Sequence, residues 1–283
     1  MVFIEGFTLK NWKNFKPVED AFAYSSDGKV ITLADGITRD PLRMSVLPNF
    51  GNPLHAYQIF KFFRNYPNPS VAKRVADLFC ASFLEDIYLR KNTKDAFDNI
   101  NKKIEEHNKK WLGAHMLKDT DYLEHDFPAC VSVGLTEKDG VVSYGFIADC
   151  GFGIFNKKGE LIFRTKNEGP NSKGSIDEAV KSKYKTGFRF PQGRKIIRSL
   201  YRNNPSEKLA YGALTGEKEA MHYVKTGEVE LRDNILVAYT DGLEDFVYSS
   251  EFAGQIKTGC DLDLIQRLGQ QRVRTEGSLV LRR

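Results

Sequence analysis

The sequence has few cysteines and no long apolar run. Its four cysteines, Cys80, Cys130, Cys150 and Cys260, include no pair with the CxxC spacing of a zinc knuckle. This usage suits a reducing compartment, so we expect a cytoplasmic protein. No stretch approaches the roughly 18 apolar residues of a membrane span. The start, MVFIEGFTLKNWK, lacks the basic and then apolar pattern of a signal peptide. We therefore expect no membrane partner.

Other features are also missing from these 283 residues. There is no linker rich in Gly, Ser or Pro, no repeat and no low-complexity tract, so we expect one domain over residues 1–283. No Gly-rich phosphate loop is present, and the five histidines lack the spacing of metal ligands. The net charge of +5 is too mild to indicate nucleic acid by itself. What is present is an apolar content of 41%, enough for a sizeable core.

Hydrophobic periodicity divides the chain into helical and strand segments. Helices are expected at 53–65, at 71–90 with Ser70 as its cap, at 94–112, and in shorter form near 216–225 and 261–270. Strands are expected on both sides of Asp27-Gly28, in PACVSVGL, VVSYGFIADC, FGIFN and ELIFRT, at 234–240, and in SLVLRR. Hairpins around a helical block, with strands returning later, indicate an α+β fold with antiparallel sheets.

Two of the four Asp-Gly pairs differ from ordinary turns. Asp27-Gly28 and Asp139-Gly140 lie in polar surroundings and are followed at once by strand-like residues, so they predict hairpins. Asp35-Gly36 in VITLADG and Asp241-Gly242 in ILVAYTDG instead end buried-looking apolar runs. Carboxylates held at strand ends are what a divalent metal site needs. Glycine lets its own backbone carbonyl approach the same ion.

More carboxylates stand at the ends of other expected strands. Glu19 and Asp20 lie in VEDAF, Asp149 follows the apolar run of FIADCG, and Glu276 lies in RTEGSLVL just before the last strand. Each also has an ordinary interpretation. Asp149 could cap a turn, and Glu19 and Glu276 could be solvated surface residues.

This order of motifs resembles the metal-dependent protein phosphatases of the PP2C family. The acidic pair, ADG, a central Asp, TDG and an acidic motif before the final strand follow the family order over nearly the whole chain. The segment YGALTGEKEA before TDG resembles the bacterial branch. The resemblance implies an α-β-β-α sandwich, with two packed antiparallel β-sheets flanked by helices. It also implies hydrolysis of phosphoserine and phosphothreonine, with a phosphoprotein as partner.

The resemblance further implies a two-metal site with Asp35 and Asp241 as its catalytic residues. Asp35 would bridge both ions, Glu19 and the carbonyl of Gly36 would serve one ion, and Asp241 would serve the other. Asp149 would match the additional metal carboxylate of the family, which leaves a third ion open. Oxygen ligands alone favour Mn²⁺ or Mg²⁺. Bound metal lowers the pKa of a water that attacks phosphorus in line.

Several positions depart from the family pattern. Thr275 stands where the last motif has a metal-binding Asp, and Glu276, one residue later and longer, is our candidate for that ligand. The phosphate-holding Arg of the family corresponds to Phe15, so Lys13 or Lys16 would hold phosphate as point charges. Two hypotheses therefore stay open. One is an active phosphatase, and the other is a catalytically silent relative that binds a phosphoprotein or another partner.

A basic stretch covers residues 172–202, with nine Lys or Arg against two acids. We interpret it as a flap beside the active site that attracts acidic phosphoprotein. The alternatives are a solvated face, or a nucleic-acid surface on which Tyr184, Phe188, Phe190 and Tyr201 would stack on bases. We do not expect nucleic acid as a partner.

Overall fold

The computed structural model describes residues 2–11, 17–39, 64, 66–90, 92–114, 127–170, 176–188, 191–273 and 275–283. Within these ranges, two five-stranded antiparallel sheets form the centre of the molecule. Sheet A has the order β1 (Ile4–Lys10), β10 (Glu276–Arg282), β9 (Ile235–Tyr239), β6 (Gly151–Phe155) and β7 (Leu161–Arg164). Sheet B has the order β2 (Ala21–Tyr24), β3 (Val30–Gly36), β4 (Cys130–Lys138), β5 (Val141–Ile147) and β8 (Lys225–Glu230).

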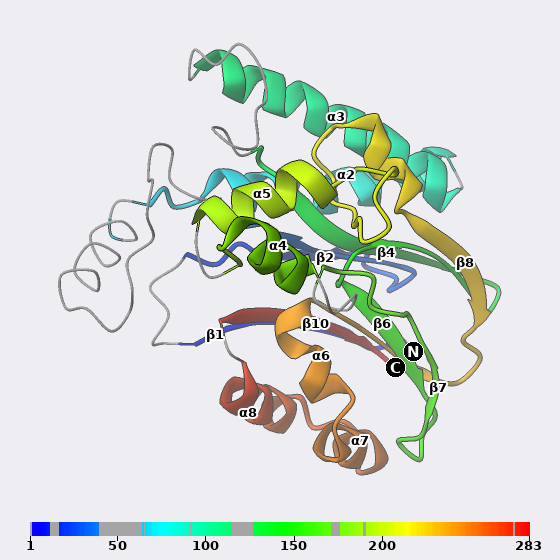
Figure 1. Ribbon diagram of the computed structural model, residues 1–283. Coiled ribbons are helices and arrows are strands. Elements are labelled where there is room, and N and C mark those ends of the chain that lie inside the picture. Colours follow the sequence, from blue (N-terminus) through cyan, green and yellow to red (C-terminus); the bar gives the residue numbers. More distant parts are fainter. Residues whose placement is uncertain are drawn as a thin grey trace.

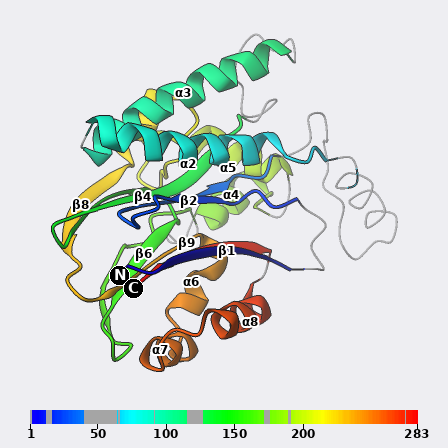
Figure 2. The same ribbon diagram turned by 180° about the vertical axis from the view of Figure 1, so that it is seen from behind.

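The helices cover the outer faces of the two sheets (Figures 1 and 2). On sheet B lie α2 (Val71–Arg90) and α3 (Thr93–Ala114), and on sheet A lie α6 (Asp241–Val247), α7 (Ser250–Lys257) and α8 (Leu262–Arg272). The remaining helical elements are α4 (Ile176–Tyr184), α5 (Pro191–Tyr201) and the 3-10 turn η1 (Lys218–His222). The α-β-β-α sandwich and the α+β class are therefore confirmed.

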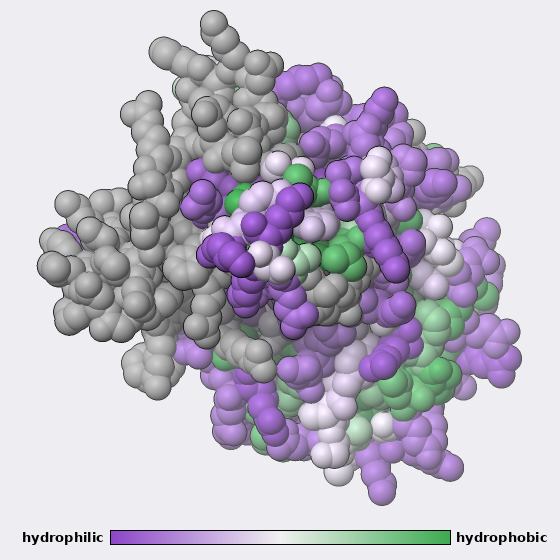
Figure 3. Space-filling model, viewed as in Figure 1, coloured by the Kyte–Doolittle hydropathy of each residue, from purple (hydrophilic) through white to green (hydrophobic). Residues whose placement is uncertain are grey.

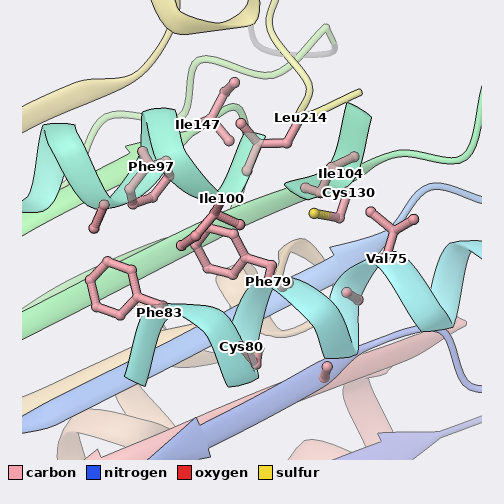
Figure 4. Close-up of a cluster of buried hydrophobic side chains, with 14 of the residues drawn as sticks. Val75, Phe79, Cys80, Phe83, Phe97, Ile100, Ile104, Cys130, Ile147 and Leu214 are labelled. Carbon is pink, nitrogen blue, oxygen red and sulfur yellow. The ribbon is translucent and has the colours of Figure 1, made fainter. Parts of the chain in front are cut away.

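Close packing of aromatic rings joins sheet B to its helices (Figure 4). The rings of Phe79 and Phe97 meet edge to face at 5.1 Å, and Phe83 lies 5.9 Å from each. Glycines on the strands below make room for them. A Cβ on Gly134 would lie 2.4 Å from the ring of Phe83, and one on Gly145 would lie 2.9 Å from Phe97. These glycines let the helices approach the sheet closely.

The helices expected at 71–90 and 94–112 are present as α2 and α3. The Ser70 hydroxyl accepts a hydrogen bond from the Lys73 amide at 3.0 Å, as a helix cap does. Hairpins turn at Asp27-Gly28 and Asp139-Gly140, with both glycines at positive φ. Apart from residue 64, the helix expected at 53–65 lies outside the described residues.

Sequence patterns missed β1, β8, α4, α5, α6 and α7. Two of these elements, α4 and α5, form a small core of their own, with Ile176, Val180, Ile196, Ile197 and Tyr211 buried together. Each helix is short and contributes only a few apolar positions among many lysines and arginines. With only nine and eleven residues, the apolar face of each helix covers two or three turns, which is a short signal in the sequence.

The surface is mainly hydrophilic on the face shown in Figure 3, with an apolar area where Figure 1 places β7. Leu161 and Ile162 of β7 are among the exposed apolar residues. None of the helices described here is both long and apolar enough to cross a bilayer. All four cysteines are buried and free of disulfide bonds.

Candidate metal centre

The hairpin between β2 and β3 places two carboxylates opposite each other. Ala21 pairs with Ala34, and the amide of Gly36 donates to the carbonyl of Glu19 at 3.3 Å. The next position along this register sets Asp20 against Asp35. Directly opposed residues on an antiparallel pair share one face of the sheet. Two acidic side chains therefore lie together where the hairpin ends.

A third carboxylate, Glu276, comes from the first residue of β10 in sheet A. Each of Asp20, Asp35 and Glu276 offers an oxygen, and these three atoms all lie within 4.8 Å of one another. One oxygen of Glu276 also accepts hydrogen bonds from the amides of Glu19 at 2.7 Å and Asp20 at 3.4 Å. Glu276 thus ties sheet A to the start of β2 and completes a group contributed by both sheets.

Asp241 reaches the same corner because two glycines allow close contact. It is the first residue of α6 and follows directly after β9 and Thr240. A Cβ on Gly242 would lie 1.8 Å from the carbonyl oxygen of Glu276, and one on Gly277 would meet Leu243 at 2.7 Å. Two backbone segments can approach this closely only where the residues in contact are glycines. The start of α6 therefore lies against the start of β10, with Asp241 exposed beside the group.

Asp149 lies where the chain crosses from sheet B to sheet A, between β5 and β6. The preceding residue, Ala148, has φ of 64°, and its carbonyl accepts from the amide of Glu168 at 2.9 Å. Gly169 approaches the carboxylate so closely that a Cβ there would lie 2.7 Å from it. Gly151 pairs with Tyr239 between β6 and β9, and continuing this register by two residues brings Asp149 level with Asp241.

Burial and mutual repulsion raise the pKa values of these carboxyl groups. Burial, followed by the charge of Glu276, raises the pKa of Asp20 to about 8. Burial and the neighbouring Asp241 raise the pKa of Asp149 to about 7. The pKa of Asp35 is held well above its ordinary value by burial and then by Asp20, Asp241 and Glu276. Without a counter-charge, such a group resists full ionisation at neutral pH.

Glu19, which the sequence assigned to the metal, has other partners in the structure. Its side chain is buried and accepts hydrogen bonds from the hydroxyls of Thr38 at 2.5 Å, Tyr66 at 3.3 Å and Ser70. Neighbouring strand residues point to opposite faces, so Asp20 rather than Glu19 faces Asp35. Within the described residues, the convergent acidic group contains Asp20 in the place that we had given to Glu19.

The other predicted site residues are placed as follows. Gly36 ends β3 against α2, where a Cβ would lie 2.7 Å from the Ala72 backbone. Thr275 is exposed, and its carbonyl accepts from the Asn11 amide at 2.8 Å. Lys13 and Lys16 lie outside the described residues.

The donor set fits a hard divalent cation. Three carboxylate oxygens converge, Asp149 and Asp241 stand next to them, and all of these donors are oxygens. Thr240 orients one donor, because its hydroxyl gives a 2.7 Å hydrogen bond to Asp20 while it accepts from the Ser278 amide at 2.8 Å. Repulsion within this group is the kind that a cation relieves.

In the absence of metal, we expect the free energy of unfolding to fall as pH rises from about 5 to 8.5. Unfolded Asp titrates near 3.8, whereas Asp149 and Asp20 in the folded protein titrate near 7 and 8. Between these values the folded state binds more protons than the unfolded state, so stability decreases with pH. Melting temperatures in EDTA at several pH values test this. Asp20→Asn should flatten the dependence, and an equally steep dependence in that variant would contradict it.

No protein-family model matches the sequence. No curated protein matches it either.

Solved structures do match over nearly the whole chain. The S. agalactiae serine/threonine phosphatase has TM-score 0.59 and 13% identity, with 100% of this chain and 99% of that one covered. The catalytic domain of the phosphatase PstP, in complex with two manganese ions, has TM-score 0.56 and 13% identity, with 99% and 97% covered. RsbX in complex with magnesium has TM-score 0.51 and 11% identity, with 100% and 98% covered.

The chain has the PP2C phosphatase fold. The resemblance indicated by the order of acidic motifs is thus confirmed for the architecture. At identities of 11–13%, the shared property is the PP2C fold itself. Two of these neighbours were crystallised with manganese or magnesium, the ions that the oxygen-only donor set of this chain favours.

Proposed function

We propose that this chain is a metal-dependent phosphatase of the PP2C family that hydrolyses phosphoserine and phosphothreonine in proteins. The observation behind the proposal is the convergence of Asp20, Asp35 and Glu276 from two separate sheets, with oxygen atoms within 4.8 Å. Asp20 and Asp35 come from one hairpin, whereas Glu276 is 241 positions beyond Asp35 and reaches them only through the fold. The neighbouring Asp149 and Asp241 supply further negative charge to the same corner.

Asp35 is the central residue of the proposed site. Burial first, and then the charges of Asp20, Asp241, Glu276 and Asp149, raise the pKa of its carboxyl group. We assign the metal ligands to these five carboxylates and to the carbonyl of Gly36, with Mn²⁺ or Mg²⁺ as the ions. Bound metal would neutralise the carboxylates and supply an activated water for attack on phosphorus.

The residues around the carboxylates hold them in place. Thr240 fixes Asp20 from sheet A, and the amides of Glu19 and Asp20 fix Glu276 from sheet B. Glu19 itself contributes to the site indirectly, because its three hydroxyl partners anchor the residues that follow β3 and precede α2. Such surrounding hydrogen bonds orient metal ligands and reduce the cost of arranging them on binding.

The basic segment around α4 and α5 lies beside this corner. Arg198 of α5 is buried and donates to the carbonyl of Thr38 at 3.1 Å, three residues after Asp35. This contact supports the interpretation of residues 172–202 as a flap next to the site. Its exposed lysines, including Lys183 and Lys185, would attract an acidic phosphoprotein. Lys13 or Lys16 remains our proposal for a phosphate contact.

Purified protein should hydrolyse p-nitrophenyl phosphate and phosphothreonine peptides when Mn²⁺ or Mg²⁺ is added, because the carboxylate group requires a cation to position water and phosphate. EDTA should abolish turnover, and excess Mn²⁺ should restore it. Asp241→Asn serves as the matched control for contaminating phosphatase and should be inactive under the same conditions.

The alternative is a silent module that binds a phosphoprotein. One observation favours it. An oxygen of Glu276 is already engaged with two backbone amides, so this residue has a structural role that needs no metal. Absence of metal-stimulated turnover on every phosphopeptide, together with binding of those peptides, would favour the silent module over the enzyme.

A further inference from the structure

A basic pocket lies at the end of sheet A opposite to the carboxylates. It has a volume of about 540 Å³, within the range of small-molecule sites. Its walls come from the last residues of β10, the first of β9, and the turns near 157, 232 and 259. Figures 1 and 2 both show the N and C marks side by side at this end.

Cations dominate the lining of this pocket. Its charged residues are Lys157, Arg232, Asp233, Lys257, Arg282 and Arg283. Two of these cations form ion pairs with acids that do not line the pocket, because Arg232 pairs with Glu230 and Arg282 pairs with Glu137. The other three cations face a single acid, Asp233. The pocket therefore carries a net positive charge that favours an anion.

The two lysines have spare hydrogen-bond donors. Lys157 and Lys257 are exposed, and neither has an ion-pair or side-chain hydrogen-bond partner within the described residues. They come from different elements, since Lys157 lies in the turn between β6 and β7 and Lys257 ends α7. Gly159 holds that turn against α7, because a Cβ there would lie 2.3 Å from the Ala253 carbonyl oxygen. The packing thus keeps the two lysine positions close to one pocket.

Arg283 covers backbone carbonyls whose partial negative charge would repel an anion. The carboxyl end of a helix carries partial negative charge, and α7 ends at this pocket. The Arg283 guanidinium donates to the carbonyls of Gly259 and Cys260, just past that helix end, and lies 4.5 Å from the ring centroid of Phe3. The carbonyls are therefore covered by a fixed positive charge.

The floor of the pocket is apolar. Ile235 and Ile256 lie at its base, where they are 6% and 2% exposed, and Val2, at 47%, is the most exposed apolar residue of the lining. An inorganic anion would leave this apolar surface unused. A ligand with one anionic group and one apolar or aromatic part would contact both regions.

We propose that this pocket binds a small organic phosphate, with the phosphate between Lys157 and Lys257 and the organic part against Val2, above Ile235 and Ile256. Ammonium groups serve as point charges for phosphate, whose several oxygens accept from more than one donor. The pocket and the carboxylates lie at opposite ends of β9 and β10, on the order of 20 Å apart at about 3.3 Å per residue. The ligand would therefore not compete with metal.

Calorimetric titration of the whole chain with AMP, in EDTA and low salt, tests the proposal. AMP is expected to bind more tightly than inorganic phosphate, and adenosine is expected not to bind. Lys157→Glu combined with Lys257→Glu should weaken AMP binding at least tenfold. Lys158→Glu, in the same turn but outside the lining, should leave it within twofold. All three lysines are exposed, so the variants should remain folded.

The result that would overturn the proposal is AMP binding that is undetectable, or that is equally tight in the double variant. Equal affinity for AMP and inorganic phosphate would also overturn it, because the apolar floor would then contribute nothing. Repeating the titration in Mn²⁺ instead of EDTA, with the wild type and with Asp35→Asn, separates this site from the metal centre. AMP binding should persist there, whereas loss of AMP binding in that variant would place the ligand at the carboxylates instead.

Discussion

Asp35→Asn is expected to lower kcat by on the order of 10³-fold or more. Asp35 lies at the centre of the carboxylate group. Asn at this position removes the negative charge that, together with the other four carboxylates, would hold the metal ions. The fold should remain intact, because the side chain lies at the end of a strand and relieves repulsion when neutralised. In EDTA the variant should be at least as stable as the wild type.

Steady-state kinetics with saturating Mn²⁺ and circular dichroism together measure this effect. Asp139→Asn is the matched control, because Asp139 is an exposed carboxylate in the turn between β4 and β5 and belongs to neither proposed site. It should retain wild-type kcat. A folded Asp35→Asn variant with near-normal kcat would remove Asp35 from the catalytic site.

Glu276→Gln is expected to weaken Mn²⁺ binding at least tenfold. Affinity for a hard divalent ion rises with the number of carboxylates around it, and Glu276 is one of three that converge. Gln keeps an oxygen that can accept from the Glu19 and Asp20 amides, so the contact between the sheets should survive. The substitution therefore separates the charge of Glu276 from its structural role.

Thr275→Asp is the informative companion to that variant. Thr275 is exposed, and Glu276 already occupies the corner that the last family motif would fill. A new carboxylate at 275 should therefore change metal affinity little. Calorimetric titration of both variants decides between the two positions. Unchanged affinity in Glu276→Gln with a clear gain in Thr275→Asp would show that Glu276 serves only the backbone amides.

The relation between Asp20 and Asp35 could have been read from the sequence. The Asp27-Gly28 turn sets the register of the hairpin, and counting back equally from it pairs Asp20 with Asp35 and leaves Glu19 beside Gly36. Motif order alone pointed to Glu19, because it gives no information about which face a residue occupies. Register supplies that information.

Other parts of the site depend on contacts that no local pattern contains. Asp241 approaches Glu276 only because Gly242 and Gly277 meet, and these glycines are 35 positions apart. The contact of α5 with the residues after β3 is made by Arg198, which donates to the carbonyl of Thr38, 160 positions away. Long-range packing of this kind decides geometry after local propensity has been satisfied, so a single sequence indicates which acids to consider but not how they face one another.

Anomalous scattering at the manganese edge, from crystals soaked in MnCl₂, tests the central claim most directly. If the carboxylates of both sheets form a metal centre, strong peaks should lie at about 2.0–2.6 Å from oxygens of Asp35. Asp20 or Glu276 should lie on one side of these peaks and Asp241 on the other. Soaked crystals with no manganese peak among these four residues, or with peaks only elsewhere on the surface, would contradict the account.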